Sequence, residues 1–339
     1  MKAFVVHENV HPSKIALTTD WPVPKLGDKQ IMVDVYSAGL NFFDILQAQG
    51  KHQSKPPLPF TLGSRSGSEF AGKVSHGFPL PAGCPLKPGD RVFGSGLGSY
   101  AEKVAADMDS VMPLPDSLTF DQGAGLFVTW PTSYEALVGR AQLQAGEWVL
   151  VTAAAGGVGL AAVQLAKGLG GKVIAAAGSQ DKLDIAKKYG GADFTVDYTK
   201  PGWQQEVLKI TNGKGADVIY DPVGMITDSL KCIAWKGRAI VVGFAAGTVE
   251  KVPMNLVLLK NISLVGIHWG AYHVKEREHM PSVYKAFLDL LESQRVSPPV
   301  VYKEVFKLDK LVDGLHALEN RQTWGKAVVR IKDEERARL

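Results

Sequence analysis

The hydrophobic positions in the second half of the chain form short continuous runs, most of them followed by a helical pattern. Residues 149–151 predict a strand buried on both faces of a parallel sheet, and the small residues of 160–169 predict the next helix. The alternation of strand and helix then repeats, which is typical of a six-stranded, doubly wound parallel sheet in an α/β fold. Further strands are expected at 172–177, 193–196, 217–221, 238–244 and 262–267, with a helix at 182–189.

The first third of the chain has shorter strands in which hydrophobic and polar residues alternate. Residues 30–37 predict a half-buried strand, and turn residues such as Lys87–Asp90 separate it from its neighbours. Many short strands with this spacing predict a compact, barrel-like β domain. The other strands are expected at 2–6, 70–74, 91–93 and 100–104, and a long loop rich in proline and glycine at 50–67.

The C-terminal part of the chain returns to the first domain in this prediction. Amphipathic patterns predict helices at 281–294 and 308–320, and 325–331 predicts a closing strand. The resulting domains are a discontinuous one formed by 1–124 and 270–339, and a nucleotide-binding one formed by 125–269.

Composition narrows the possible partners and compartments. The formal net charge of +4 is small and the basic residues are scattered, so nucleic acid is not required as a partner. No apolar run approaches the length of a membrane span. The two cysteines, Cys84 and Cys232, lie far apart and form no pair motif, which favours a reducing compartment such as the cytoplasm.

The segment Ala154–Gly159 lies between the first strand of the sheet and its helix. It is a variant of the dinucleotide fingerprint, with Ala154 at the first glycine position. A glycine at 156 lets the backbone approach a pyrophosphate, and a glycine at 159 lets helix and strand pack closely. The helix N-terminus offers N–H groups to the phosphate charge. We therefore expect Ala155, Gly156, Gly157 and Val158 to bind the cofactor.

The end of the second strand predicts which cofactor is used. Sites specific for NAD place an acidic residue about twenty residues beyond the glycines, where it bonds the ribose 2′-hydroxyl. Gly178 stands at that place here, followed by Ser179 and Lys182. Glycine leaves room for a 2′-phosphate that serine and lysine can bind, so NADPH is the expected cofactor.

Several motifs resemble one known family. Ala38–Asp44, Pro88–Val92 and the glycine loop resemble the medium-chain dehydrogenase/reductase superfamily, whose members combine a GroES-like β-barrel domain with a Rossmann domain. Within it, the chain is most similar to the zinc-free quinone oxidoreductases (the zeta-crystallin group). Three segments are similar to the branch of quinone oxidoreductase-like proteins, namely 55–61, 243–247 and 259–263.

The resemblance implies roles for residues outside the glycine loop. Asn41 corresponds to an asparagine near the nicotinamide ribose and substrate, Thr129 to a residue facing the nicotinamide, and Tyr198 to a tyrosine that contacts the 2′-phosphate. Trp269 and Tyr272 either wall the pocket or pack at a domain interface. The family also implies a homodimer. The remaining residues expected at the cofactor are Val223, Phe244, Ala246, Ile267, Trp269 and Lys326.

The same comparison argues against a catalytic zinc. Asn41 stands where zinc-dependent relatives carry a cysteine, and 67–69 reads Gly-Ser-Glu in place of Gly-His-Glu. A zinc site needs three or four grouped ligands, and no histidine or cysteine grouping is present in the sequence. Quinones and α,β-unsaturated carbonyls accept a hydride without a Lewis acid, so they are the expected substrates.

Two segments depart from the family pattern. Leu46 and His52 replace tyrosines, and 62–69 contains a short insertion with Arg65. His52 and Arg65 either contact the substrate or are solvated loop residues. Asp44 is expected to cap the following helical turn.

Other functions remain possible at this point. One is an enoyl-thioester (enoyl-CoA) reductase, and another is a non-catalytic NADPH-binding sensor, structural or RNA-binding protein. Residues 337–339 read Ala-Arg-Leu, a variant of a peroxisomal address.

Overall fold

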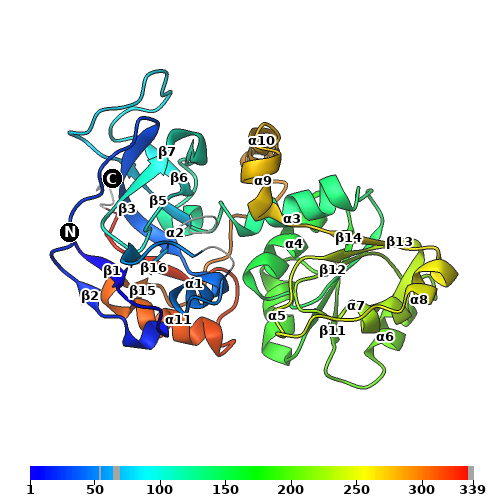
Figure 1. Cartoon of the computed structure of the whole chain (residues 1–339). Coiled ribbons are helices and arrows are strands. Elements are labelled where there is room, and N and C mark those ends of the chain that lie inside the picture. The colour runs from blue at the N-terminus through cyan, green and yellow to red at the C-terminus, as the bar shows by residue number, and fades with distance from the viewer. Residues whose placement is uncertain (53–54, 64–68, 335–339) are drawn as a thin grey trace. The chain divides into compact units, whose positions relative to one another are not determined.

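The computed structural model describes residues 1–52, 55–63 and 69–334. The chain forms two compact units, shown in Figure 1. Unit 1 contains Met1–Val128 and Val301–Leu339, and unit 2 contains Thr129–Val300. Arg65 and residues 337–339 lie outside the described residues, so the predictions made for them stay untested.

Unit 2 is a six-stranded parallel sheet with the order β11-β10-β9-β12-β13-β14, flanked by helices. Read from β9 as the first strand, this is the order 3-2-1-4-5-6 of the Rossmann fold, as the sequence predicted. The strands are β9 (Trp148–Val151), β10 (Lys172–Ala177), β11 (Phe194–Asp197), β12 (Ala216–Asp221), β13 (Ile233–Val241) and β14 (Ser263–Gly266). The helices are α3 (Thr129–Glu135), a π-turn (Ala136–Arg140), α4 (Gly157–Gly168), α5 (Gln180–Lys188), α6 (Trp203–Ile210), α7 (Ile226–Ser229), a 3₁₀ turn (Leu230–Cys232), α8 (Met254–Lys260), α9 (Trp269–Lys275) and α10 (Met280–Glu292).

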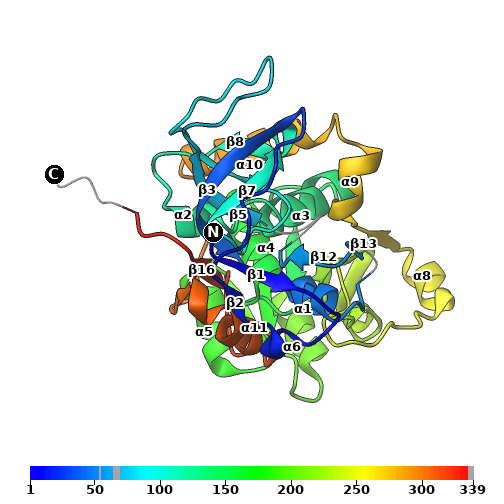
Figure 2. The ribbon, with the colours of Figure 1, turned by 60° about the vertical axis from the view of Figure 1, so that its left-hand side comes forward.

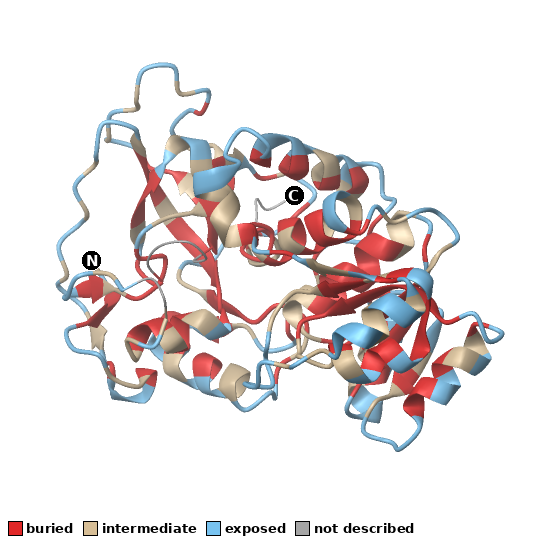
Figure 3. Ribbon diagram, turned by 45° about the vertical axis from the view of Figure 1, so that its right-hand side comes forward, coloured by how far each residue is buried: buried red, intermediate tan, exposed pale blue. Residues whose placement is uncertain are grey.

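Burial explains why the strands of unit 2 read as continuous apolar runs. Val149, Leu150 and Val151 in β9 are fully buried, because helices cover both faces of a parallel sheet. Figure 3 shows the same contrast between buried strands and the exposed outer faces of the helices.

Unit 1 is built on a sheet with the order β15-β16-β3-β5-β6-β8, in which β7 also pairs with β3. A smaller sheet has the order β2-β1-β4, and α1 and α11 lie side by side (Figure 2). The strands are β1 (Ala3–Val6), β2 (Leu17–Thr18), β3 (Gln30–Gly39), β4 (Phe60–Thr61), β5 (Glu69–Val74), β6 (Arg91–Ser95), β7 (Lys103–Asp107), β8 (Val111–Pro113), β15 (Phe306–Lys307) and β16 (Val328–Arg330). The helices are α1 (Phe42–Ala48), α2 (Phe120–Gly123) and α11 (Leu311–Glu319), with 3₁₀ turns at Pro12–Lys14, Met108–Ser110 and Leu308–Lys310.

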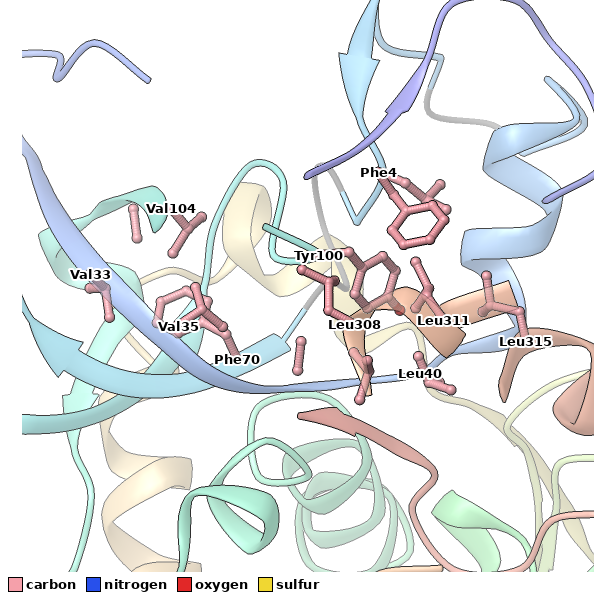
Figure 4. Close-up of a cluster of buried hydrophobic side chains, with 14 of the residues drawn as sticks. Phe4, Val33, Val35, Leu40, Phe70, Tyr100, Val104, Leu308, Leu311 and Leu315 are labelled. Atoms are coloured by element: carbon pink, nitrogen blue, oxygen red, sulfur yellow. The ribbon is translucent and has the colours of Figure 1, made fainter. Parts of the chain in front are cut away.

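The core of unit 1 joins segments that are distant in the sequence. Phe4, Phe70 and Tyr100 from the N-terminal part pack with Leu308 and Leu311 from the return segment (Figure 4). This shared core makes the unit discontinuous, as the sequence analysis expected.

Two segments differ from the sequence-based expectation. The strand expected at 100–104 begins only at Lys103, because the backbone just before it bonds a different segment. The carbonyl of Tyr100 accepts from the N–H of Phe4, and Ala101 forms a bridge with Ala3 of β1. The return to unit 1 was expected at 270, whereas the two units divide at Val300. The physical reason is that α10 packs on α3, with the rings of Phe287 and Trp130 5.9 Å apart.

Candidate functional site

The turn after β9 has the geometry expected of a phosphate-binding loop. Gly156 is the extended N-cap of α4, and the helix begins at Gly157. A Cβ atom at position 159 would lie 2.2 Å from the carbonyl oxygen of Ala153, so only glycine allows the helix to start this close to the strand. The first N–H groups of α4 have no intrahelical acceptor, and they face any anion bound at this turn. Ala155, Gly156, Gly157 and Val158 therefore lie at the turn from β9 into the first residues of α4.

The residues expected to choose the cofactor lie together at the ends of β10 and β11. Gly178 is exposed, and a Cβ atom at this position would lie 3.3 Å from Cε2 of Tyr198. The Tyr198 backbone N–H donates to the carbonyl of Ala177, which fixes the tyrosine beside the glycine. Ser179 is the N-cap of α5, and Lys182 lies in the first turn of that helix. A glycine without a Cβ, flanked by hydroxyl and ammonium groups, fits an additional phosphate at the ribose.

The loops after β12 and β13 are tied to each other. The Ala246 N–H donates to the carbonyl of Val223 at 3.0 Å, so the segments that contain Val223 and Phe244 are neighbours. Ile267 follows β14, and its N–H donates to the carbonyl of Val241 at the end of β13. The carboxyl ends of parallel strands are where ligands bind in open α/β sheets, and these four predicted residues lie there.

One buried carboxylate ties the loop after β12 to the end of β9, and the sequence analysis did not assign it a role. Asp221 ends β12 and is fully buried. It accepts hydrogen bonds from the N–H groups of Val223, Gly224 and Met225 and from the hydroxyl of Thr152. An aspartate at the end of a buried strand, followed by Pro-Val-Gly, was the available signal in the sequence.

In unit 1, Asn41 belongs to a buried polar network. Its Oδ1 accepts from Nζ of Lys326 at 2.7 Å, and its Nδ2 lies 3.3 Å from Oε1 of Glu69. Lys326 also forms an ion pair with Glu69, whose Oε2 accepts from the N–H groups of Phe127 and Val128. Asn41, Lys326 and Glu69 are 8%, 5% and 0% exposed. The arrangement fixes the orientation of the Asn41 amide, because its oxygen faces an ammonium group.

A second buried acid, Asp44, is bonded to the backbone of Asn41. Asp44 accepts from the N–H of Asn41 and from the hydroxyl of Tyr100, which confirms the capping role predicted for it. Burial raises the pKa of the Asp44 carboxyl to about 7, against the lowering effects of the Tyr100 and Asn41 hydrogen bonds and of the Lys326 charge. Burial raises the pKa of the Tyr100 phenol well above its usual range, and the neighbouring Asp44 carboxyl raises it further.

Three other residues predicted at the site, Thr129, Trp269 and His52, lie in separate segments of the chain. Thr129 begins α3 and is buried, and Trp269 begins α9 with its ring centroid 4.9 Å from that of Tyr272. The ring of His52 lies 5.9 Å from that of Phe43 in unit 1.

Among residues 1–52, 55–63 and 69–334, no three histidine, cysteine, aspartate or glutamate side chains are grouped to hold a metal ion. In the same ranges, every helix is too short or too polar to cross a bilayer.

Comparison with known proteins gives two family matches. Residues 157–293 match the family described as zinc-binding dehydrogenase, and residues 27–116 match the alcohol dehydrogenase GroES-like domain. The chain is 38% identical over 328 residues to quinone oxidoreductase-like protein 2 of Rattus norvegicus, covering 94% of this chain and 90% of the relative.

Solved structures extend these matches. A probable oxidoreductase from Mycobacterium abscessus is 32% identical, with a TM-score of 0.86 over 98% of this chain and 99% of that one. The Escherichia coli quinone oxidoreductase complexed with NADPH is 28% identical, with a TM-score of 0.84 over 98% of this chain and 100% of that one.

Proposed function

The chain belongs to the medium-chain dehydrogenase/reductase superfamily and, within it, to the quinone oxidoreductases, and on that premise we propose an NADPH-dependent, zinc-free reductase of quinones or α,β-unsaturated carbonyls. The observation that carries the proposal is the presence of two glycine turns that can accept phosphate groups, one at Gly156 after β9 and one at Gly178 after β10. The first fits a pyrophosphate and the second fits a 2′-phosphate. NADPH, when bound, supplies the hydride.

The residues of this chain have separate tasks in the proposal. Gly156, Gly157 and the start of α4 bind the pyrophosphate, while Ser179, Lys182 and Tyr198 bind the 2′-phosphate. The loop after β12, which Asp221 fixes, and the loop after β13 bonded to it hold the nicotinamide end of the cofactor. Asn41 positions the acceptor, and its replacement of a zinc-ligating cysteine favours acceptors that need no Lewis acid.

The experiment is NADPH oxidation followed optically with 1,4-benzoquinone, 9,10-phenanthrenequinone, an alkenal and crotonyl-CoA, with NADH in parallel. Turnover of a quinone or the alkenal with preference for NADPH is the expected result. Preference for crotonyl-CoA would make the protein an enoyl-thioester reductase and would justify a test of targeting by residues 337–339. Tight NADPH binding without any turnover would leave a sensor, structural or RNA-binding role and overturn the proposal.

The cofactor preference gives a direct prediction. Replacing Gly178 with aspartate should lower kcat/KM for NADPH by about 10- to 100-fold, because a carboxylate beside Tyr198 and Ser179 repels the 2′-phosphate. The rate with NADH should change much less. The Gly178→Ala variant is the matched control, since it adds a Cβ atom next to Tyr198 without charge. Equal losses in both variants would mean that space, rather than charge, sets the preference.

We also propose that the protein is a homodimer paired along β14. This strand is the last of its sheet and pairs with β13 alone in the described part of the chain, and Leu258 on the preceding α8 is 78% exposed. Leu258→Glu should yield monomers by light scattering. Val274→Glu, at a position that is 88% exposed on α9, should leave the dimer intact. A monomeric wild-type protein would refute the pairing.

A further inference from the structure

A buried carboxylate at the end of α3 holds the segment that follows the last strand of unit 2. Glu135 is 6% exposed. Its Oε1 accepts from the hydroxyl of Tyr272 at 3.2 Å, and its Oε2 lies 3.1 Å from Nε2 of His279. Tyr272 lies in α9, and His279 is the N-cap of α10. One side chain therefore fixes both ends of the connection between these helices.

The backbone next to Glu135 is shaped around this carboxylate. The residues after it, Ala136–Arg140, form a π-turn, a feature that often marks functional sites in helices. A Cβ atom at Gly139 in this turn would lie 2.1 Å from Oε1 of Glu135. Glycine at this position is therefore required for the carboxylate to occupy its place.

The segment held by Glu135 carries an unpaired hydrogen-bond donor. The rings of Tyr272 and Trp269 lie at 30° to each other with centroids 4.9 Å apart, and Tyr284 contacts Trp269 edge-on. Trp269 is 5% exposed, and its Nε1 is buried with no hydrogen-bond partner among the described residues. A buried donor without a partner is unfavourable, so an acceptor atom supplied by a ligand would be bound favourably there.

We propose that Trp269 donates its indole N–H to the carbonyl oxygen of the electron acceptor, and that Glu135 is a positioning residue that holds Trp269 in place through Tyr272. The assignment rests on the proposed reductase function. Transfer of a hydride from NADPH to a quinone or enone carbon, which leaves NADP⁺, places negative charge on the carbonyl oxygen, and a proton from water then completes the reduction. A donor that is already fixed in place stabilises this charge without reorganisation. The acceptor class is therefore a planar carbonyl compound whose oxygen reaches the indole.

The variants separate the donor from its support. Trp269→Phe removes the N–H and should lower kcat for 9,10-phenanthrenequinone by about 10- to 100-fold, with the Kd for NADPH unchanged. Glu135→Ala should lower kcat by a similar factor, because the Tyr272 hydroxyl loses its acceptor. Glu135→Gln should restore most of the rate, since its amide oxygen can accept from Tyr272 and a change of tautomer lets His279 pair with its NH₂ group. Tyr134→Phe is the control, because it removes a hydroxyl one residue away and leaves both donors to Glu135 in place.

Each result decides the assignment. Thermal unfolding of every variant identifies those that fail to fold, and Glu135→Gln keeps the test valid if Glu135→Ala is one of them. Wild-type kcat in Trp269→Phe would exclude the indole donor. Equal losses in Glu135→Gln and Glu135→Ala would mean that the charge of Glu135 acts rather than its geometry, which overturns the positioning role. An inactive wild type would instead refute the reductase function itself, together with this assignment.

Discussion

Replacing Lys326 with methionine should lower the free energy of unfolding of unit 1 by about 3–5 kcal/mol, the usual cost of removing one partner from a buried ion pair. Glu69 would lose its cationic partner in a place where none of its surface is exposed. Its Oε2 would still accept from the Phe127 and Val128 N–H groups, but Oε1 would lose the ammonium group and keep the amide of Asn41. Denaturant unfolding followed by far-UV circular dichroism measures the loss.

The loss should depend on the charge of Glu69 rather than on the volume of lysine. The double variant Lys326→Met with Glu69→Gln should recover most of the stability, because it removes both charges together. Lys285→Met is the surface control, since Lys285 pairs with Asp289 on the exposed side of α10, and such pairs contribute at most about 1 kcal/mol. A double variant as unstable as Lys326→Met alone would contradict the role of the ion pair.

The same ion pair should matter for activity. Lys326 donates to Oδ1 of Asn41, so its loss frees the amide to rotate. If Asn41 positions the acceptor, KM for the quinone should rise in Lys326→Met even at temperatures where the variant is folded.

Stability should fall as the pH rises from about 5 to about 8, and Asp44 should cause much of this change. The pKa of Asp44 is raised from 3.8 to about 7, so the folded protein holds a proton that the unfolded chain has lost. This contribution is complete below the unfolded pKa and is lost progressively until the pH passes the folded pKa. Linkage gives a loss of about 3 kcal/mol between pH 5 and pH 8.

Asp44→Asn removes the titration while keeping an oxygen that can accept from the Asn41 N–H. The difference in melting temperature between this variant and wild type should therefore grow in favour of the variant as the pH rises. Tyr100→Phe is the informative partner, because the Tyr100 hydrogen bond lowers the pKa of Asp44. Its removal should move the loss of stability to higher pH. Parallel pH profiles for wild type and Asp44→Asn would contradict the raised pKa.

The sequence predicts those parts of the site that depend on local order. Gly178, Ser179 and Lys182 follow one strand directly, and their neighbourhood with Tyr198 follows from the pairing of adjacent parallel strands. The turn at Gly156 is likewise a local feature of a strand followed by a helix. Because each of these features is set by neighbours in the chain or in the sheet, a pattern in the sequence is enough to find it.

Contacts between distant segments could not be predicted in the same way. Lys326 meets Asn41 across 285 positions of the chain, and Glu135 meets Tyr272 across 137. The periodicity of a sequence does not show which donor pairs with which buried acid. The sequence analysis therefore predicted Lys326 as a cofactor contact and did not predict its ion pair with Glu69. The strand expected at 100–104 starts later, at Lys103, for a related reason, since the residue pattern does not show that Ala101 pairs with Ala3 near the start of the chain.

The position of β16 has a consequence for the order in which the protein folds during synthesis. This strand, Val328–Arg330, lies between β15 and β3, so the main sheet of unit 1 is incomplete until residues 328–330 have left the ribosome. Unit 2 is one continuous segment, Thr129–Val300, and emerges earlier. Domains generally fold as units while the chain is made. The Rossmann unit is therefore complete at a stage when β3 still lacks its pairing with β16. The edge of β3 that pairs with β16 is therefore made long before the strand that covers it.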